Sequence, residues 1–348
     1  MSDAVVAMSA PIAVAILIAF LIALGVVRAA IAYAHRRGMF DQPGQRRSHK
    51  IPTPRGGGIG IVVSVLLTVP VCLLYAPGAC PLHIVVTLSV AFLLVAWIGW
   101  WDDHRSLPAL PRFGVQMLAA ALFSASLLLH GPSWLWLPLL VLAGAWSINL
   151  HNFMDGIDGL LAQQGVFVAG GLGIVGWLAG QAALAGASAC VAAACLGFWC
   201  YNRAPARIFM GDVGSGSVGL LLFALTAMLW RVNWLLLWPA LILSSAFVTD
   251  ATLTLLTRIV GGRRWYTAHR EHLYQWIVRR GHTHAVATAW YGGWNLLVAA
   301  PLAALAWEMP GMGLVACIVT YVIAAVVWLS AKRRMIQRDR YKVRYVRT

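Results

Sequence analysis

The stretch from residue 149 to residue 160 reads NLHNFMDGIDGL and follows a long apolar run. It carries two amides and two acids at steps of three residues: Asn149, Asn152, Asp155 and Asp158. If the apolar helix continues through the stretch, these side chains share one slowly turning face. Acids beside a membrane-length apolar segment are costly unless they hold a cation or bind a substrate. Because Mg²⁺ accepts such oxygens beside substrate phosphates, the pattern favours a metal or substrate site over a plain helix end.

Two further acidic stretches lie beside apolar runs. In WIGWWDDHRS, Asp102 and Asp103 are adjacent, so they do not share a helical face, and one could touch a metal while the other acts as a base. Two solvated acids at a helix end would give the same sequence pattern. In FMGDVGSGS, Asp212 opens a glycine-rich segment. Phe209 before it could stack on a base ring, although simple packing is the better explanation from these residues alone.

Two basic loops complete the set of chemically capable residues. DQPGQRRSHKIPTPRGGGIG contains Lys50, and its glycines would let backbone N–H groups approach an anion; a cytoplasmic loop that is merely positive fits equally well. In the loop AHREHLYQ, His269 and His272 are three apart and flank Arg270, a combination suited to phosphate oxygens. HExxH is absent, which excludes a zinc-protease motif.

Three other polar residues lie near this loop, and the sequence predicts a setting for each. Asp250 lies near the inner end of an apolar run, and we expect it to pair with an arginine of the loop or to face the site. His282 and His284 follow the loop, and we expect them to be solvated.

The elements that must position these residues are membrane spans. Hydrophobic residues make up 61% of the 348 residues and charged residues 11%, a balance that excludes an ordinary soluble domain. Eleven apolar segments have the length of a span, and they cover residues 9–31, 57–75, 82–101, 113–130, 134–150, 163–180, 182–200, 213–230, 233–256, 286–306 and 311–331. The sequence therefore predicts an all-α integral membrane protein, with residues 1–348 as one polytopic domain.

Charge gives these spans an orientation. With the N-terminus outside and the C-terminus cytoplasmic, 25 of the 26 Lys and Arg residues fall on the cytoplasmic side, as the positive-inside rule requires. This rule explains the net charge of +15 without a nucleic-acid partner. The basic tail 332–348 is expected to meet the anionic inner leaflet of the bilayer. All the acid-bearing loops then share the cytoplasmic side, which predicts an active site there for one lipid and one soluble nucleotide.

Five motifs occur in one order and give the chain a family resemblance. They are HKIPTPRGGG, DD after the third span, NxxNxxDGxDG, FMGDxGS and the histidine-bearing fifth loop. Over nearly its whole length the chain resembles the polyprenyl-phosphate N-acetylhexosamine-1-phosphate transferases of glycosyltransferase family 4. That family includes the initiators of bacterial O-antigen and common-antigen synthesis, and the phospho-MurNAc-pentapeptide translocase is a more distant branch.

The resemblance implies an activity and its partners. A sugar-1-phosphate passes from a UDP-N-acetylhexosamine to undecaprenyl phosphate, and UMP is released, as the first membrane step of O-antigen, lipopolysaccharide or related cell-surface polysaccharide synthesis. The resemblance places the enzyme in the bacterial inner membrane with Mg²⁺ as cofactor. It also admits Mn²⁺ in place of Mg²⁺, and a homodimer.

The resemblance also implies roles for individual residues. Asp212 and Asp155 match the metal ligands, and Asp102, Asp103 and His272 the catalytic positions. The residues that match nucleotide or substrate positions are Lys50, Asn149, Asn152, Asp158, Phe209, His269 and Arg270. A phosphate nucleophile is already ionised near pH 7, because its second pKa is about 6. We therefore expect direct in-line attack without a covalent aspartyl intermediate.

One departure from the family pattern bears on the sugar. The common-antigen enzymes carry HxHH in the fifth loop and the translocase carries HHHFE, whereas residues 272–275 here read HLYQ. This favours UDP-GlcNAc or a 6-deoxy relative, such as UDP-N-acetylfucosamine or UDP-N-acetylquinovosamine, over the translocase substrate. A multi-spanning transporter or flippase of anionic solutes is the alternative from another class, but it would need ionisable groups near mid-span.

Overall fold

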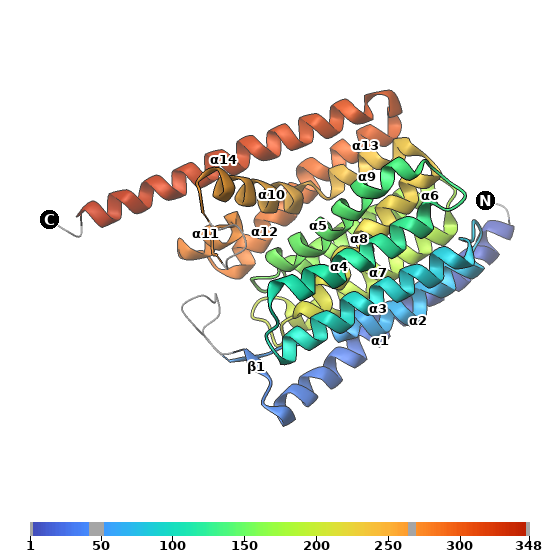
Figure 1. Ribbon diagram of the computed structural model, residues 1–348, viewed down its shortest axis with the longest axis horizontal. Helices are drawn as coiled ribbons and strands as arrows, with labels where there is room; N and C mark the ends of the chain where they lie inside the picture. Colours follow the sequence, from blue (N-terminus) through green and yellow to red (C-terminus); the bar gives the residue numbers. More distant parts are fainter. Residues whose placement is uncertain (1–2, 42–51, 264–268, 346–348) are drawn as a thin grey trace.

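The long apolar runs form α-helices, the fold that satisfies its own backbone N–H and C=O groups inside a bilayer (Figure 1). The computed structural model describes residues 3–41, 52–263 and 269–345, with side chains from residue 10 to residue 335 of these ranges. The first half contains α1 (Asp3–Arg37), α2 (Ile59–Tyr75), α3 (Leu82–His104), α4 (Ala109–Leu128), α5 (Leu137–Met154), α6 (Leu160–Leu178) and α7 (Ala182–Asn202). The second half contains α8 (Asp212–Val232), α9 (Leu237–Leu243), α10 (Ser245–Val260), α11 (Leu273–Arg279), α12 (His284–Trp294), α13 (Ala300–Glu308) and α14 (Gly313–Tyr345).

Each predicted apolar segment overlaps one of these helices or a pair of them. Within the described residues, eight helices are long and apolar enough to cross a membrane, and a ninth span results if α9 and α10, bent by 74° at their junction, are taken together. α2 has only 17 residues, and a π-helical segment, Asn295–Ala299, joins α12 to α13. The all-α membrane fold is therefore confirmed, whereas the count of eleven crossings stays a prediction.

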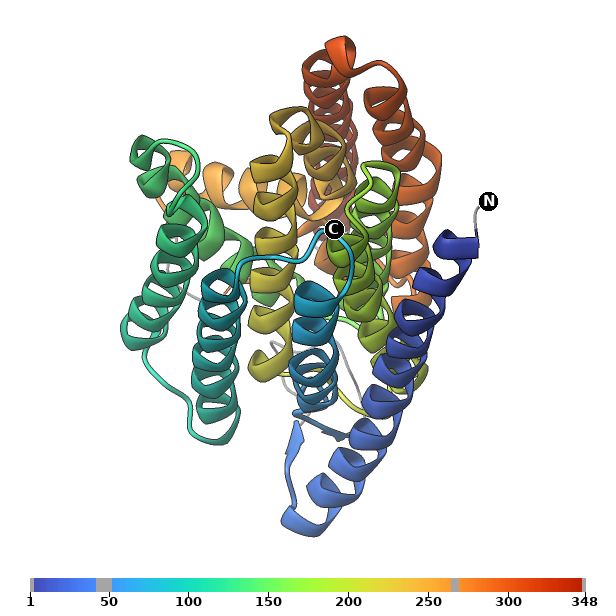
Figure 2. The ribbon, with the colours of Figure 1, turned by 90° about the vertical axis from the view of Figure 1, so that its right-hand side faces the viewer.

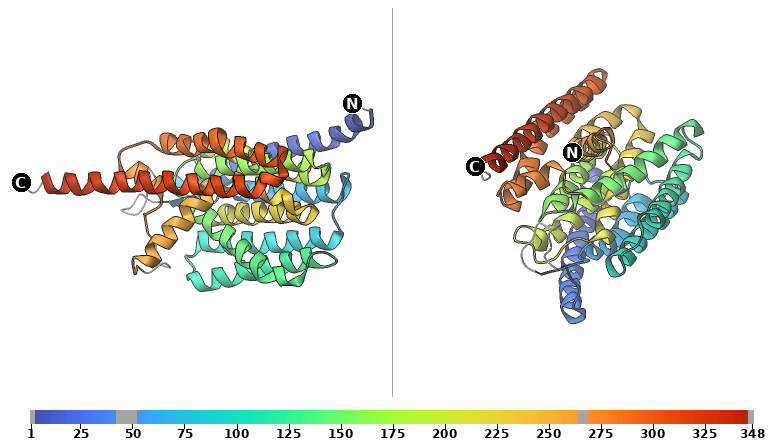
Figure 3. Two further views of the ribbon diagram at one scale, coloured as in Figure 1. Left: turned by 90° about the horizontal axis from the view of Figure 1, so that it is seen from above. Right: turned by 60° about the vertical axis from the view of Figure 1, so that its left-hand side comes forward.

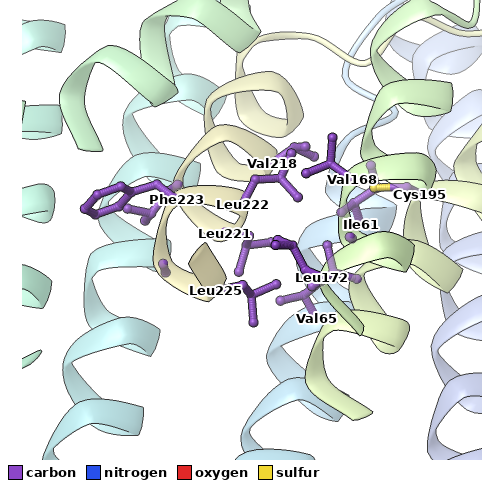
Figure 4. Close-up of a cluster of buried hydrophobic side chains, with 14 of the residues drawn as sticks. Ile61, Val65, Val168, Leu172, Cys195, Val218, Leu221, Leu222, Phe223 and Leu225 are labelled. Carbon is purple, nitrogen blue, oxygen red and sulfur yellow. The ribbon is translucent and has the colours of Figure 1, made fainter. Parts of the chain in front are cut away.

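Helix α8 forms the centre of the bundle (Figure 2). It packs against α3 and α5, and its side chains Val218, Leu221 and Leu222 meet residues of α2, α6 and α7 in a buried cluster (Figure 4). Glycines allow this close approach: a Cβ at Gly219 would lie 2.5 Å from the carbonyl oxygen of Ser147. A central helix fixed in this way gives its N-terminal residue, Asp212, a rigid support.

The polar connections meet at one end of the bundle, as their hydrogen bonds show. The two-residue strands β1 (Phe40–Asp41) and β2 (Thr53–Pro54) pair antiparallel, and the carbonyl oxygen of Pro54 accepts a hydrogen bond from the N–H of Phe209. The carbonyl oxygens of Phe209 and Met210 in turn accept from Gly57 and Gly58. These glycines therefore bind another loop of the protein. The helix α14 extends past this end of the bundle (Figure 3).

Candidate active site

The adjacent acids at the end of α3 have different partners. Both carboxylate oxygens of Asp103 accept backbone hydrogen bonds from the start of α8, one from Asp212 (2.9 Å) and one from Val213 (3.1 Å). Asp102 accepts a hydrogen bond from the N–H of Leu107 and pairs with Arg112 at 2.6 Å. The side chain of Asp103 is only 1% exposed and that of Asp102 11%. Asp103 therefore acts as a buried acceptor at the N-terminus of α8, where an anion also complements the helix dipole.

Two arginines join three acids at the same end of the bundle. Arg55 contacts Asp103 at 2.8 Å and Asp212 at 3.1 Å, and Arg112 contacts the second oxygen of Asp212 at 2.8 Å. Burial lowers the pKa of Arg55, but the charges of Asp103 and Asp212 outweigh it, so the net shift is upward. The Arg55 guanidinium is thus firmly cationic. Both arginines stand beside Asp212, the carboxylate that the family motif assigns to the metal.

Helix α5 ends sooner than the polar spacing predicts. It stops at Met154, so Asp155 and Asp158 lie in the connection to α6 and the shared helical face extends only over the two asparagines. Of these, Asn149 donates to Gln116 on α4, whereas Asn152 donates to the hydroxyl of Ser215 on α8 at 3.0 Å.

The acids of this connection have distinct surroundings. Burial and the neighbouring charge of Asp212 raise the pKa of Asp155 to about 8. Asp158 lies 3.0 Å from the Nδ1 atom of His284 and accepts a hydrogen bond from the N–H of Ala206 at 3.0 Å. Asp158 therefore ties the connection both to α12 and to the loop before α8.

A cavity of about 270 Å³ opens between these loops. Its lining includes five residues that the sequence predicts for the site: Asn152, Asp155, Asp158, Phe209 and Asp212. It also includes residues absent from that prediction, namely Asp41, Arg55, Asn202, Gln275 and His284. The cavity thus combines acids, amides and a guanidinium group with an imidazole and a phenyl ring.

The histidine-bearing loop reaches the cavity through another residue, Gln275. His272 is buried and stacks between Phe153 (ring centroids 6.2 Å apart) and Tyr274 (5.8 Å), and the ring of His269 lies 5.0 Å from it. Burial lowers the pKa of His272, and burial lowers that of His269 to about 4. The lowered pKa values shift both imidazoles toward the neutral form.

The remaining predicted site residues that the structure describes do not line the cavity. Asp102, Asp103, Asn149, His269, Arg270 and His272 are not among the residues that line it. Asp102 and Asp103 nevertheless connect to Asp212 through Arg112 and through the backbone of α8. Lys50 falls outside the described residues.

Several residues that line the cavity were not among the predicted site residues. Arg55 belongs to the quoted PRGGG motif and Gln275 to HLYQ, so both carried a signal in the motif itself. His284 was expected to be a solvated loop residue, and this was wrong: its side chain is 14% exposed and lies against Asp158. Asp250 was expected to pair with an arginine or to face the site; instead its carboxylate accepts hydrogen bonds from Thr254, Leu273, Tyr291 and Trp328.

The donor set fits a divalent cation of the Mg²⁺ type. In the described ranges, no point is surrounded by three or more His, Cys, Asp or Glu side chains, so a closed protein cage is absent there. Mg²⁺ is usually held by one or two carboxylates together with water and substrate phosphates. Asp155, Asp212 and Asn152 line one cavity and supply such oxygens.

Comparison with known proteins finds relatives that cover most of the chain. The model of glycosyl transferase family 4 matches residues 85–230. The decaprenyl-phosphate N-acetylglucosaminephosphotransferase of Mycolicibacterium smegmatis is 32% identical over 344 residues, covering 85% of this chain and 82% of the relative.

Two further relatives, whose names differ from that of the mycobacterial protein, are also similar to this chain. A probable undecaprenyl-phosphate N-acetylglucosaminyl 1-phosphate transferase of Bacillus subtilis is 26% identical over 79% of this chain and 80% of its own length. A phospho-N-acetylmuramoyl-pentapeptide-transferase of Shouchella clausii is 29% identical over 71% of this chain and 82% of its own length.

Proposed function

Because the chain belongs to glycosyl transferase family 4 and is a phosphoglycosyl transferase, we propose that it transfers N-acetylhexosamine-1-phosphate from a UDP-sugar to undecaprenyl phosphate and releases UMP. The observation that carries this proposal is the cavity lined by Asp155, Asp212, Asn152, Arg55 and Phe209. It offers oxygen ligands and a cation for a diphosphate and an aromatic ring for a base.

In this proposal Asp212 and Asp155 hold Mg²⁺, with Asn152 beside them. The bound cation would neutralise phosphate charge and polarise the phosphorus that is attacked. Mn²⁺ suits the same oxygen donors. Asp158 and Phe209 form the nucleotide side of the cavity, and the aromatic ring of Phe209 stacks on the base.

The protein's own charges address the main obstacle, the repulsion between two anionic substrates. Arg55 and Arg112 border Asp212 from two sides and can neutralise phosphate oxygens that approach it. The lipid phosphate is ionised near pH 7 and attacks directly, so a strong general base is not required. Both oxygens of Asp103 are engaged by backbone N–H groups, which supports a reaction without a covalent aspartyl intermediate. Trapping a phosphosugar on Asp102 or Asp103 would refute direct attack.

We further propose eleven crossings of the bacterial inner membrane, with the N-terminus outside and the cavity on the cytoplasmic side. Two observations support this orientation. The positive charges divide 25 to 1 between the two sides, and the loops that hydrogen-bond to one another around the cavity are those assigned to the cytoplasm. The basic tail beyond residue 332 then follows a span on the side where anionic lipid attracts it.

The proposed sugar is UDP-GlcNAc or a 6-deoxy relative, for entry into O-antigen or related surface polysaccharide synthesis. Relatives named for N-acetylglucosamine support UDP-GlcNAc. The HLYQ sequence, whose Gln275 lines the cavity, is compatible with a 6-deoxy sugar. The test is a panel of UDP-GlcNAc, UDP-GalNAc, UDP-N-acetylfucosamine, UDP-N-acetylquinovosamine and UDP-MurNAc-pentapeptide with undecaprenyl phosphate and Mg²⁺, assayed for UMP and lipid product.

Each outcome of the panel decides between the proposal and its alternatives. Turnover with one N-acetylhexosamine supports the proposal and identifies the sugar. Turnover with UDP-MurNAc-pentapeptide alone would instead make the protein a translocase. If the folded protein releases no UMP from any sugar of the panel, the proposed sugars are excluded and a UDP-sugar outside the panel is tested next. Transport of a labelled anionic solute in proteoliposomes then tests the transporter alternative.

A further inference from the structure

Asp250 is a buried carboxylate that joins four helices outside the cavity. It lies on α10, is 2% exposed, and accepts hydrogen bonds from Tyr291 on α12 (2.6 Å) and from the indole of Trp328 on α14 (2.8 Å). Thr254 of its own helix donates at 3.1 Å. The N–H of Leu273, the first residue of α11, donates to both carboxylate oxygens at 2.9 and 3.1 Å. Four donors satisfy a charge that would otherwise be costly to bury.

The bond to Leu273 fixes a helix that is too short to be stable alone. α11 has seven residues, and isolated helices of that length do not persist in water. Its start is anchored by Asp250, and the preceding Glu271 pairs with Arg258 of α10 and with Arg263. The position of α11 is therefore fixed by its contacts with α10, which Asp250 in turn ties to α12 and α14.

From this position α11 supports the cavity. The hydroxyl of Tyr274 donates to the carbonyl oxygen of Phe153 at 2.9 Å, two residues before Asp155. The side-chain amide of Gln275, which lines the cavity, donates to the hydroxyl of Tyr274 at 3.1 Å. A chain of contacts thus runs from Asp250 through Leu273 and Tyr274 to the connection that carries Asp155 and Asp158.

We propose that Asp250 is a positioning residue for sugar-nucleotide binding: by holding the start of α11 it sets where Tyr274 and Gln275 stand at the cavity. It does not touch the cavity itself. This inference rests on the proposed function for its kinetic consequence, and on the hydrogen bonds of the described residues for its structural one.

The kinetic test compares two variants that each remove a hydrogen bond at the same carboxylate. Asp250→Asn removes the charge that holds Leu273, whereas Thr254→Val removes a donor on α10 and leaves α11 anchored. We expect Asp250→Asn to raise the KM for the UDP-sugar about tenfold with a smaller fall in kcat, and Thr254→Val to leave KM unchanged. Tyr274→Phe should also raise the KM for the UDP-sugar. The KM of the double variant Asp250→Asn/Tyr274→Phe should not exceed that of the single variant with the higher KM.

A second measurement is independent of turnover. Hydrogen–deuterium exchange in detergent should be faster in Asp250→Asn than in the wild type for peptides covering residues 271–279 and 153–159, with no such change in Thr254→Val. Unchanged exchange in Asp250→Asn, or an equal change in both variants, would overturn the inference. So would a fall in kcat and thermal stability with KM unaltered. Failure of the proposed function is a separate result, because it appears as no UMP release from the wild-type protein itself.

Discussion

Asp103 holds the helix that carries Asp212. Its two carboxylate oxygens accept the N–H groups of Asp212 and Val213 at 2.9 and 3.1 Å, while its neighbour Asp102 faces Arg112. The two adjacent acids therefore differ in role: Asp103 fixes the N-terminus of α8, and Asp102 belongs to the more exposed group of charges next to Asp212. This division follows from burial, because a carboxylate that is 1% exposed needs its bonds filled by the protein.

The first prediction separates the two acids by stability. Asp103→Asn should lower the free energy of unfolding by about 1–2 kcal/mol, because a neutral amide accepts only one of the two N–H groups that the carboxylate accepts. Asp102→Asn should cost less, about 0–1 kcal/mol, because its pair with Arg112 is partly exposed. Thermal unfolding in detergent measures both. Equal losses, or a larger loss in Asp102→Asn, would contradict the assignment of Asp103 to the helix start.

The second prediction concerns the metal. Asp212→Ala should lower Mg²⁺-dependent UMP release by at least about 100-fold while the protein still inserts and folds, because the oxygen ligand proposed for the cation is lost. Removal of divalent ions with EDTA should bring the wild type to the same background, and added Mg²⁺ should restore only the wild type. Full activity in the variant would exclude Asp212 as the metal ligand.

The third prediction concerns Arg112, which contacts Asp102 and Asp212 at 2.6 and 2.8 Å. Arg112→Gln removes a cation that competes with the metal for Asp212, so we expect half-saturation at a lower Mg²⁺ concentration. The same change removes a charge that neutralises phosphate oxygens, so kcat should fall by about 10²-fold. Arg112→Lys should lie between the variant and the wild type. A higher Mg²⁺ requirement in Arg112→Gln would show that the arginine supports the metal site instead of competing with it.

Much of this site could be predicted from the sequence, because the bilayer restricts what a long apolar run can do. Each apolar segment overlaps a helix or a pair of helices, and five of the predicted residues line the cavity. The pairing of Arg55 with Asp212 could not be predicted in this way, because it joins residues 157 positions apart. Backbone hydrogen bonds between residues 54–58 and residues 209–210 bring the two segments together.

Interruptions within the spans were also hidden from the sequence. The helix breaks at Ser244 in the run LILSSAFVTD, which contains no Gly or Pro at the break. The end of α5 at Met154 is consistent with Gly156 and Gly159 as helix breakers, but the close approach of Gly156 to Tyr274, a residue more than a hundred positions later, could not be predicted. Contacts of this kind depend on tertiary packing, which local periodicity does not encode.

The fourth prediction tests base stacking by Phe209. Its backbone is fixed by bonds to Pro54 and Gly57, so truncation of the ring should leave the loop in place. Stacking of a base on an aromatic ring contributes about 1–3 kcal/mol, so Phe209→Ala should raise the KM for the UDP-sugar about tenfold or more. Phe209→Tyr should remain near the wild type, and the KM for undecaprenyl phosphate should not change. An effect confined to the lipid substrate would move Phe209 to the other side of the reaction.

The last prediction concerns the close approach of Gly156 and Tyr274. A Cβ at position 156 would lie 2.1 Å from the tyrosine hydroxyl, which is the group that donates to the carbonyl oxygen of Phe153. Gly156→Ala must therefore displace Tyr274, and we expect it to cost about 1–3 kcal/mol of stability and to raise the KM for the UDP-sugar. Tyr274→Phe in the same background should recover part of the stability, because the clashing oxygen is gone.

Gly170 on α6 provides the matched control for this change, because a Cβ there meets nothing within 4 Å. Gly170→Ala should be neutral or stabilise the helix by up to about 1 kcal/mol, since alanine restricts the unfolded chain more than glycine does. Thermal unfolding and UMP release compare the two alanine variants directly. If Gly156→Ala proves as stable and as active as Gly170→Ala, Tyr274 is free to move away from Phe153, and the support that α11 gives to the connection carrying Asp155 is not needed for binding.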